Sequence, residues 1–497
     1  MDLSRRRFLA ASVAAVQATR SAKTSAAPWE QARVRQPANA DLPYLSVAEA
    51  AVLLRTRKLS PVELTQAVFD RIARVEPRVH AFITITQDDA MRAARAAERE
   101  ITAGKYRGPL HGIPFGVKDT HYTTGIRTTA NTPVLTDFVP DFDATVVARL
   151  KQAGAVLVGK LSLPEFSFGG SPVGGGEFPD AANPWDLSRT PGGSSSGSGA
   201  ALAAGLVLAA TGGDTSGSIR NPAALCGVVG MKPTYGRVSR YGIIAISWSL
   251  DHVGPMTRTV ADNARLLNVL AGHDPLDDSS SEQPVPDYTQ SLTRGVRGLR
   301  IGIPKPALFD GYHSDVMRAF EDALIVFRKL GARVAEVDMP PTLVAMDDVQ
   351  TIVRISEAAS YHQPYLASRA DRYGKTNVRR DVEAGSLITA VQYLQAQKVR
   401  AKFVREFTAL FRTFDVFLTP GFPAPAGEPS DVAQPFRRVF NVCGFPALVL
   451  PAGFSSSPDG LPIGLQIAAS PFAEATIYAA AAAFEAATAW HLKRPVL

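Results

Sequence analysis

The sequence predicts one large α/β domain whose core is a mixed or parallel β-sheet. The chain has 497 residues, 46% of them hydrophobic and 20% charged, which is enough apolar material for a large buried core. Short apolar runs between turn residues alternate with segments of helical periodicity, a pattern typical of buried strands joined by helices. No internal repeat and no clear linker divides the chain.

Helices are predicted first, from Ser46 to about Gly104. The segments SVAE at 46–49 and SPVE at 60–63 are capping boxes, and apolar residues then recur every three or four positions. After Gly108 the pattern changes to short apolar runs between glycines. These runs predict buried strands, at 113–117, 155–158 and 206–210.

The second half of the chain is predicted to contain a helical excursion at residues 312–412, which is rich in Arg and Ala. Strand-like runs return at 415–419 and 447–451. The Ala-dominated segment 474–490 predicts a final helix.

Residues 1–27 are predicted to be an export signal rather than part of the folded domain, which would span 28–497. The segment SRRRFL at 4–9 matches a twin-arginine signal, an apolar stretch follows, and small residues at 25–27 offer a cleavage site. A basic disordered tail is the alternative. We therefore expect a periplasmic or secreted protein.

Composition argues against several other classes of protein. Most of the formal net charge of +7 lies in residues 1–27, and no basic run with interleaved aromatics follows, so no nucleic-acid partner is expected. No apolar segment is long enough for a membrane span. Cys226 and Cys443 allow at most one disulfide, and no His or Cys spacing indicates a metal site, so neither metal nor other cofactor is expected.

Two further motifs indicate other chemistries. GAVLVGK at 154–160 imitates a phosphate-binding loop, but Leu161 stands where Ser or Thr should follow and the interior is apolar, so we expect a strand. GSSSG at 193–197 fits the nucleophile elbow of α/β-hydrolases, with Ser195 as nucleophile. The residues before it form a poor strand, so the elbow is kept only as an alternative.

The candidate chemistry combines a lysine with a Gly/Ser-rich region. Lys118 closes an apolar strand-like run, where burial would lower its pKa and make the neutral amine available as a base. A neutral lysine beside a serine activates a hydroxyl without histidine. Glycines around Ser194 and Ser218 would let backbone N–H groups converge on one point, as an oxyanion hole requires.

These segments resemble the amidase signature family. The resemblance is carried by HGIPFGVKDT at 111–120, PGGSSSGSGAALAAGL at 191–206 and GGDTSGSIRNPAALCGVVGMKPTYGRVS at 212–239, and it extends over nearly everything after residue 45. It implies a single large domain with a mixed β-sheet core covered by helices on both faces. It also implies hydrolysis of a carboxylic amide through an acyl-enzyme.

Carried over residue by residue, the resemblance implies a catalytic triad. Ser218 would be the nucleophile, and Ser194, after a cis peptide bond, would relay its proton to neutral Lys118. Ser196 and Ser216 stand where the family has glycine, and a positive φ at either position would carry strain. The implied oxyanion hole and its supporting residues are the backbone amides of Thr215, Ser216, Gly217 and Ser218, with the side chains of Asp214, Arg220 and Ser195.

Three functions are compatible with this resemblance. The predicted one is a stand-alone amidase, monomer or homodimer, acting on a small-molecule amide, ester or carbamate. The alternative is the A-type component of glutamyl-tRNA amidotransferase, which the export signal opposes and for which segment 435–440 lacks an acidic residue to hold a glutamine amino group. A binding protein without catalysis is the third. Phe168, Trp248 and Tyr361 are candidate pocket residues.

Overall fold

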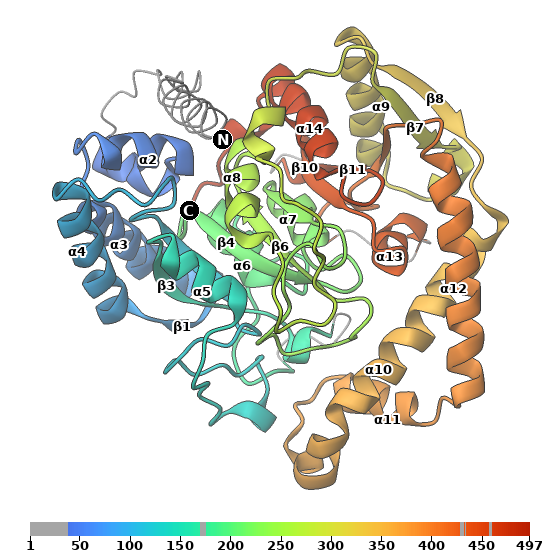
Figure 1. Ribbon diagram of the computed structural model, residues 1–497, viewed down its shortest axis with the longest axis horizontal. Helices are drawn as coiled ribbons and strands as arrows, with labels where there is room; N and C mark the ends of the chain where they lie inside the picture. The colour runs from blue at the N-terminus through green and yellow to red at the C-terminus, as the bar shows by residue number, and fades with distance from the viewer. Residues whose placement is uncertain (1–37, 169–174, 428–431, 433, 457–459) are drawn as a thin grey trace, which may run out of the picture. The chain divides into compact units, whose positions relative to one another are not determined.

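Eleven strands form one mixed sheet in the computed structural model, which describes residues 38–168, 175–427, 432, 434–456 and 460–497 (Figure 1). The strands lie in the order β1-β3-β2-β4-β6-β5-β10-β11-β9-β7-β8. β2 and β7 each have parallel neighbours on both sides, and the other pairs are antiparallel. The strands are β1 Phe82–Ile85, β2 Pro114–Lys118, β3 Val156–Leu161, β4 Ala209–Asp214, β5 Val229–Lys232, β6 His252–Thr257, β7 Arg300–Pro304, β8 Arg333–Val337, β9 Val416–Pro420, β10 Ala447–Phe454 and β11 Pro462–Ala468.

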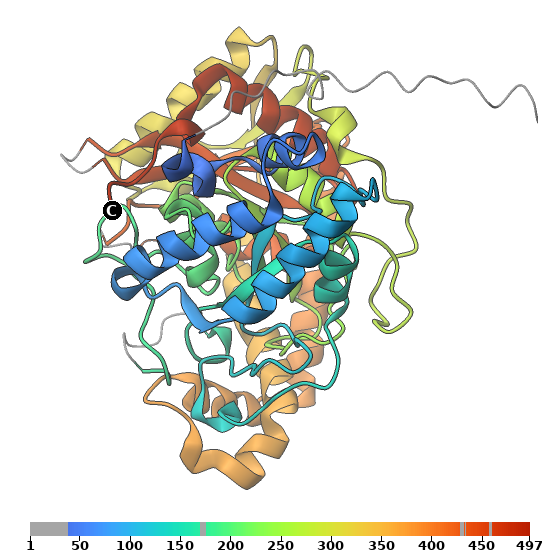
Figure 2. The same ribbon diagram turned by 90° about the vertical axis from the view of Figure 1, so that its left-hand side faces the viewer.

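Helices cover both faces of this sheet, as predicted. Gly464 and Gln466 of β11 contact α7, whereas the preceding residue Ile463 packs against α9, because alternate strand residues point to opposite faces. The α-helices are α2 Val47–Arg55, α3 Pro61–Val79, α4 Gln87–Thr102, α5 Thr145–Gln152, α6 Ser196–Ala203, α7 Arg220–Cys226, α8 Val260–Leu270, α9 Ser314–Lys329, α10 Met346–Arg369, α11 Val378–Ser386, α12 Ala390–Leu410, α13 Pro435–Val442 and α14 Glu474–Thr488. The blue helices α3 and α4 lie side by side near β3 (Figure 2).

Local signals in the sequence account for many of these elements. Both capping boxes form, with Ser46 and Ser60 as N-caps of α2 and α3. β2 and β3 are buried along their whole length, as their apolar runs predict. Residues 154–160 therefore contribute a strand and not a phosphate loop, and Lys160 lies buried 3.1 Å from Asp119.

Six of the eleven strands fall outside the predicted runs, and two of these six lie in segments that were predicted to be helical. β1 interrupts the helical segment after Ser46, and β8 interrupts the predicted helical excursion at 312–412. Both lie at the edges of the sheet, and their side chains are partly or fully exposed. An edge strand buries few side chains, so hydrophobic periodicity does not distinguish it from the surrounding helices.

The rest of that excursion is helical. α10 packs against α11, α12 and α13, and the orange helices α10 and α12 stand beside the sheet domain in Figure 1. In the part of the chain that the structure describes, no helix combines the length and apolar character that a bilayer span needs. Cys226 and Cys443 are free thiols, so the one disulfide that the sequence allows is absent. The predicted export signal lies outside the described residues.

The close contact of α10 with α11 depends on Gly385. A Cβ at this buried helical position would clash with the Ile355 carbonyl oxygen of α10. Helix propensity alone would make Gly385→Ala stabilising by about 1 kcal/mol. We expect the clash to outweigh that gain, so that the free energy of unfolding, measured with denaturant, falls by about 1–3 kcal/mol.

The matched control is Ala384→Gly, one residue earlier on the exposed face. The free energy of unfolding of this variant should fall by about 1 kcal/mol, because glycine has a lower helix propensity than alanine. A Gly385→Ala protein as stable as the natural one would show that α10 and α11 separate at no cost.

Candidate active site

Lys118 ends β2 inside the protein and contacts Ser194. Its side chain is 1% exposed, and Nζ donates a hydrogen bond to Ser194 Oγ at 2.7 Å. The peptide bond between Gly193 and Ser194 is cis. Burial lowers the pKa of Lys118 to about 7, although the negative charges of Asp214 and Asp251 act in the opposite direction. At neutral pH a large fraction of this lysine is therefore the uncharged amine.

The sheet brings the second Gly/Ser-rich loop to the same place. β4 runs parallel to β2 and ends at Asp214, after which residues 215–219 lead into α7. Ser195 connects the two loops, because its N–H donates to the Ser218 carbonyl at 3.0 Å and its Oγ bonds to the N and O of Gly213 at 3.2 Å. Ser218 Oγ itself has no hydrogen-bond partner among the described residues.

A buried ion pair supports the loop that carries Ser218. Arg220 Nε lies 3.0 Å from Asp214 Oδ2, and both side chains are buried. Burial opposes ionisation of Asp214, but the charge and hydrogen bonds of Arg220 outweigh it and lower the pKa of the carboxyl. Arg220 also donates to Gln466 Oε1 and Asn441 Oδ1, each at 2.7 Å.

One of the four amides expected in the oxyanion hole is engaged elsewhere. The Gly217 N–H donates to Asp214 Oδ1 at 2.7 Å, and the Ile219 N–H donates to Oδ2 at 3.1 Å. The amides of Ser216 and Ser218 make no hydrogen bond to another described residue. The Gly217 amide therefore holds the loop against Asp214, and the oxyanion role of the Thr215, Ser216 and Ser218 amides stays a prediction.

The two serines that replace family glycines are accommodated without backbone strain. Neither Ser196 nor Ser216 has a positive φ. Ser196 begins α6, and its Oγ donates to the Ser162 carbonyl at 3.3 Å. Ser216 Oγ accepts a hydrogen bond from Gln350 Nε2 at 2.6 Å. Gln350 lies on α10 in no recognisable motif, so sequence reasoning missed it.

A cavity of about 300 Å³ adjoins Lys118. Asp214, Thr215, Asp251 and Trp248 are among its lining residues, and Trp248 is 64% exposed. Of the three predicted pocket residues, only Trp248 lines this cavity.

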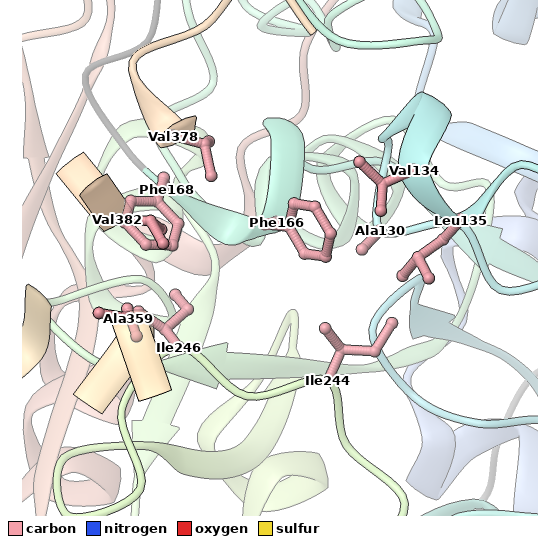
Figure 3. Close-up of a cluster of buried hydrophobic side chains, with 11 residues drawn as sticks. Ala130, Val134, Leu135, Phe166, Phe168, Ile244, Ile246, Ala359, Val378 and Val382 are labelled. Carbon is pink, nitrogen blue, oxygen red and sulfur yellow. The ribbon is translucent and has the colours of Figure 1, made fainter. Parts of the chain in front are cut away.

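Phe168 and Tyr361 belong instead to a packed cluster. Phe168 and Ile246 gather on one side and Ala130 on the other, with Phe166 between them (Figure 3). Tyr361 packs against the same cluster, and its ring lies 5.4 Å from that of His362. Among the described residues, no group of three or more His, Cys, Asp or Glu side chains could hold a metal ion.

Known proteins resemble this chain over most of its length. A family model described as Amidase matches residues 63–478. The A-type component of glutamyl-tRNA(Gln) amidotransferase from Geobacter sp. (strain M21) is 43% identical over 485 residues, 91% of this chain and 99% of the relative.

Solved structures agree with the fold. The crystal structure of the corresponding glutamyl-tRNA(Gln) amidotransferase component from Thermotoga maritima matches with a TM-score of 0.74 and 34% identity, covering 90% of this chain and 95% of that one. The native peptide amidase from Stenotrophomonas maltophilia matches with a TM-score of 0.81 and 32% identity, covering 91% and 99%.

These comparisons contradict the predicted stand-alone hydrolase. Several relatives between 40% and 43% identical, aligned over at least nine-tenths of this chain, are named as the A-type component of glutamyl-tRNA(Gln) amidotransferase, which was the less favoured alternative. The error came partly from seeking a glutamine-binding group only in segment 435–440. Polar groups also reach the Ser218 loop from α10, as Gln350 does.

The Asp214–Arg220 pair provides a test of this architecture. Arg220→Met leaves a buried carboxylate without its counter-charge, so the free energy of unfolding should fall by about 3–5 kcal/mol. Denaturant unfolding followed by circular dichroism measures this loss. In the double variant Asp214→Asn/Arg220→Met the free energy of unfolding should fall by less than the sum of the losses in the two single variants.

The control is Arg300→Met, which breaks the exposed pair with Asp415. The free energy of unfolding should fall much less in this variant, because water replaces the lost partner at the surface. Equal losses in Arg220→Met and Arg300→Met would mean that the buried pair does not stabilise the loop.

Proposed function

This chain belongs to the amidase family, and from that premise we propose that it releases ammonia from the side-chain amide of glutamine as the A-type component of a glutamyl-tRNA amidotransferase. It is an enzyme that hydrolyses amide C–N bonds. The observation that carries the glutamine assignment is the relatives' shared name at 40–43% identity. The buried contact of Lys118 with Ser194, next to Ser218, supports the chemistry.

In the proposed mechanism Ser218 Oγ attacks the amide carbonyl. Its proton passes through the Ser194 hydroxyl to the neutral amine of Lys118. The amides of Ser216 and Ser218 stabilise the negative oxygen of the tetrahedral intermediate. The Lys118 ammonium returns a proton to the leaving nitrogen, which departs as ammonia and leaves an acyl-enzyme.

Water then repeats the same steps on the acyl-enzyme. Its proton goes to Lys118 by way of Ser194, and collapse of the intermediate restores Ser218 and releases glutamate. The balance is glutamine plus water giving glutamate plus ammonia. Asp214 and Arg220 take no proton in this scheme, because they hold the loop in shape through Gly217 and Ile219.

The partner follows from the same proposal. The relatives' name describes one component of a larger enzyme, so we expect a complex with other chains in place of the monomer or homodimer predicted from sequence. The twin-arginine export signal stays a prediction for residues 1–27. An exported chain would not meet cytoplasmic tRNA, so the native location of the protein bears directly on which acceptor receives the ammonia.

The nucleophile assignment predicts the result of one substitution. We expect Ser218→Ala to lower ammonia release from L-glutamine by about 10³-fold or more, because no other group forms the acyl-enzyme. The assay uses the protein purified together with the chains that accompany it. Ser195→Ala is the control for the elbow alternative and should lose far less. Full activity in Ser218→Ala with loss in Ser195→Ala would reverse the assignment.

The pKa of Lys118 predicts the pH dependence. Only the neutral amine accepts a proton, so kcat/KM should be level in mild alkali and fall as pH drops below about 7. Asp251 raises this pKa, so Asp251→Asn should shift the acid limb to lower pH. A profile that is flat from pH 5 to 9 would mean that Lys118 is not the base.

A further inference from the structure

A turn at residues 246–251 contributes to the wall of the cavity that Lys118 lines. Ile246 and Asp251 are both lining residues of this cavity. Asp251 holds the turn from inside, because its Oδ2 accepts hydrogen bonds from the N–H groups of Ile246 at 2.9 Å and Ser247 at 3.1 Å. The Asp251 N–H also donates to the Ser247 carbonyl at 3.0 Å. Ser247 and Asp251 therefore move as one unit.

Glu357 of α10 holds the same turn from the opposite side of Ser247. Its Oε2 accepts hydrogen bonds from the Ser249 N–H at 2.9 Å and from the Ser247 hydroxyl. Its Oε1 accepts from the Ser249 hydroxyl at 2.7 Å and from the Tyr393 hydroxyl of α12 at 2.8 Å. Four donors, three from the turn and one from α12, thus converge on one partly buried carboxylate.

Arg400 of α12 binds the turn beside Glu357. Its guanidinium donates to Ser249 Oγ at 2.8 Å and to the Ser249 carbonyl at 2.9 Å, and it is itself fixed by the Val442 carbonyl at 2.7 Å. The Ser249 hydroxyl therefore bridges the two charged groups. Hydrogen bonds to charged groups are shorter and stronger than those between neutral groups, so the helical excursion fixes where the turn lies.

The position of the turn affects the ionisation of Asp251. Burial raises the pKa of this carboxyl, and the hydrogen bonds from the Thr215 hydroxyl and from the amides of Ile246 and Ser247 act in the opposite direction. The charge of Asp251 in turn raises the pKa of Lys118, against the larger effect of burial. A displaced turn would withdraw two of these donors, so Asp251 would hold its charge less well and the pKa of Lys118 would fall.

Six further ionisable groups face Asp251, Lys118 or Glu357 from neighbouring parts of the chain. They are Asp214, His121, Arg240, Tyr235, Tyr361 and Arg400. None of the six accepts a hydrogen bond from the Ile246 or Ser247 N–H group, so displacement of the turn acts first on Asp251.

We propose that Glu357 is a positioning residue for the base of the reaction: it holds the turn at 246–251, and the turn keeps the Asp251 carboxylate in the wall of the cavity that Lys118 lines. The inference rests on the proposed function for the role of Lys118 as base. Glu357 touches no reacting atom and acts through the turn. α10 thereby influences how readily the lysine accepts a proton, although it contributes no group to the proton transfer.

The test measures the rate at which a neutral alkyl fluorophosphonate modifies Ser218 as a function of pH, in the protein purified with the chains that accompany it. Ser218 Oγ bonds to phosphorus, fluoride departs, and the serine proton passes to Lys118, so the rate falls where Lys118 is charged. In Glu357→Ala we expect this acid limb to shift to lower pH, because Lys118 loses an anionic neighbour. The shift should have the direction of that in Asp251→Asn and be no larger.

Glu357→Gln separates the holding of the turn from the charge of Glu357. Glutamine has the same shape, its amide oxygen accepts from the Ser249 N–H, and the surrounding hydroxyls rotate to suit it. The acid limb should therefore stay close to that of the natural protein. A shift in Glu357→Gln as large as in Glu357→Ala would mean that the charge acts on Lys118 directly, which overturns the positioning role.

Ser249→Ala tests the same connection if Glu357→Ala fails to fold. It keeps both Glu357 and Arg400 and removes the hydroxyl that bridges them, so the limb should shift in the same direction. The matched control is Glu406→Ala, which removes another partly buried carboxylate of the excursion, one that accepts from the Thr342 hydroxyl. Its limb should stay in place. Equal shifts in both variants would reduce the effect to a general loosening of the helices and overturn the proposal.

Combination with Asp251→Asn identifies the route. If Glu357 acts through Asp251, adding Glu357→Ala to Asp251→Asn should shift the limb no further. A second shift of the same size would refute that route.

Ammonia release from L-glutamine, measured on the same samples, keeps the two proposals apart. If the limbs shift as expected but glutamine is not cleaved, the role of Glu357 stands and the glutamine assignment fails. If the natural protein shows no acid limb in its reaction with the fluorophosphonate, Lys118 is not the base and the role of Glu357 fails with it.

Discussion

The buried pair of Asp214 and Arg220 is the interaction on which the rest of the site depends. Asp214 ends β4 and holds the amides of Gly217 and Ile219, so it sets the course of the loop through Ser218. Arg220 extends the contact to β11 through Gln466 and to α13 through Asn441. Burying two charges is expensive, and the surrounding hydrogen bonds offset that cost only while every partner stays in position. The ion pair thereby couples the shape of the nucleophile loop to the packing of the sheet.

Two buried lysines on neighbouring strands illustrate how the surroundings decide chemistry. Lys160 of β3 lies 3.1 Å from Asp119 and donates to the Thr128 hydroxyl, so its charge has a direct partner. Lys118 of β2 contacts a serine hydroxyl, and the carboxylates that influence it act from farther away. Burial lowers the pKa of both amines. Lys118, unlike Lys160, forms no ion pair with a described carboxylate, so its neutral amine can exchange protons with the Ser194 hydroxyl.

Sequence reasoning found the parts of the fold and site that depend on local patterns. Capping boxes, buried strands and the Gly/Ser loops around Lys118, Ser194 and Ser218 all follow from neighbouring residues. The edge strands β1 and β8 were missed because they bury little. The engagement of the Gly217 amide was also missed, since it depends on how a loop folds back on Asp214. Contacts between distant segments leave no such pattern, as Gln350 and Ser216 illustrate.

The hydrogen bond between Gln350 and Ser216 has a mechanical consequence. A glycine at position 216 would offer no side-chain atom for α10 to hold, whereas the serine hydroxyl joins the helical excursion directly to the nucleophile loop. α10 also packs against α11 and α12, so this hydrogen bond connects a group of three helices to Ser216, whose amide belongs to the proposed oxyanion hole. A shift of α10 along its axis by the length of a hydrogen bond would stretch or release that connection. The loop that carries Ser218 is thus held in part by helices that contain none of the proposed reacting groups.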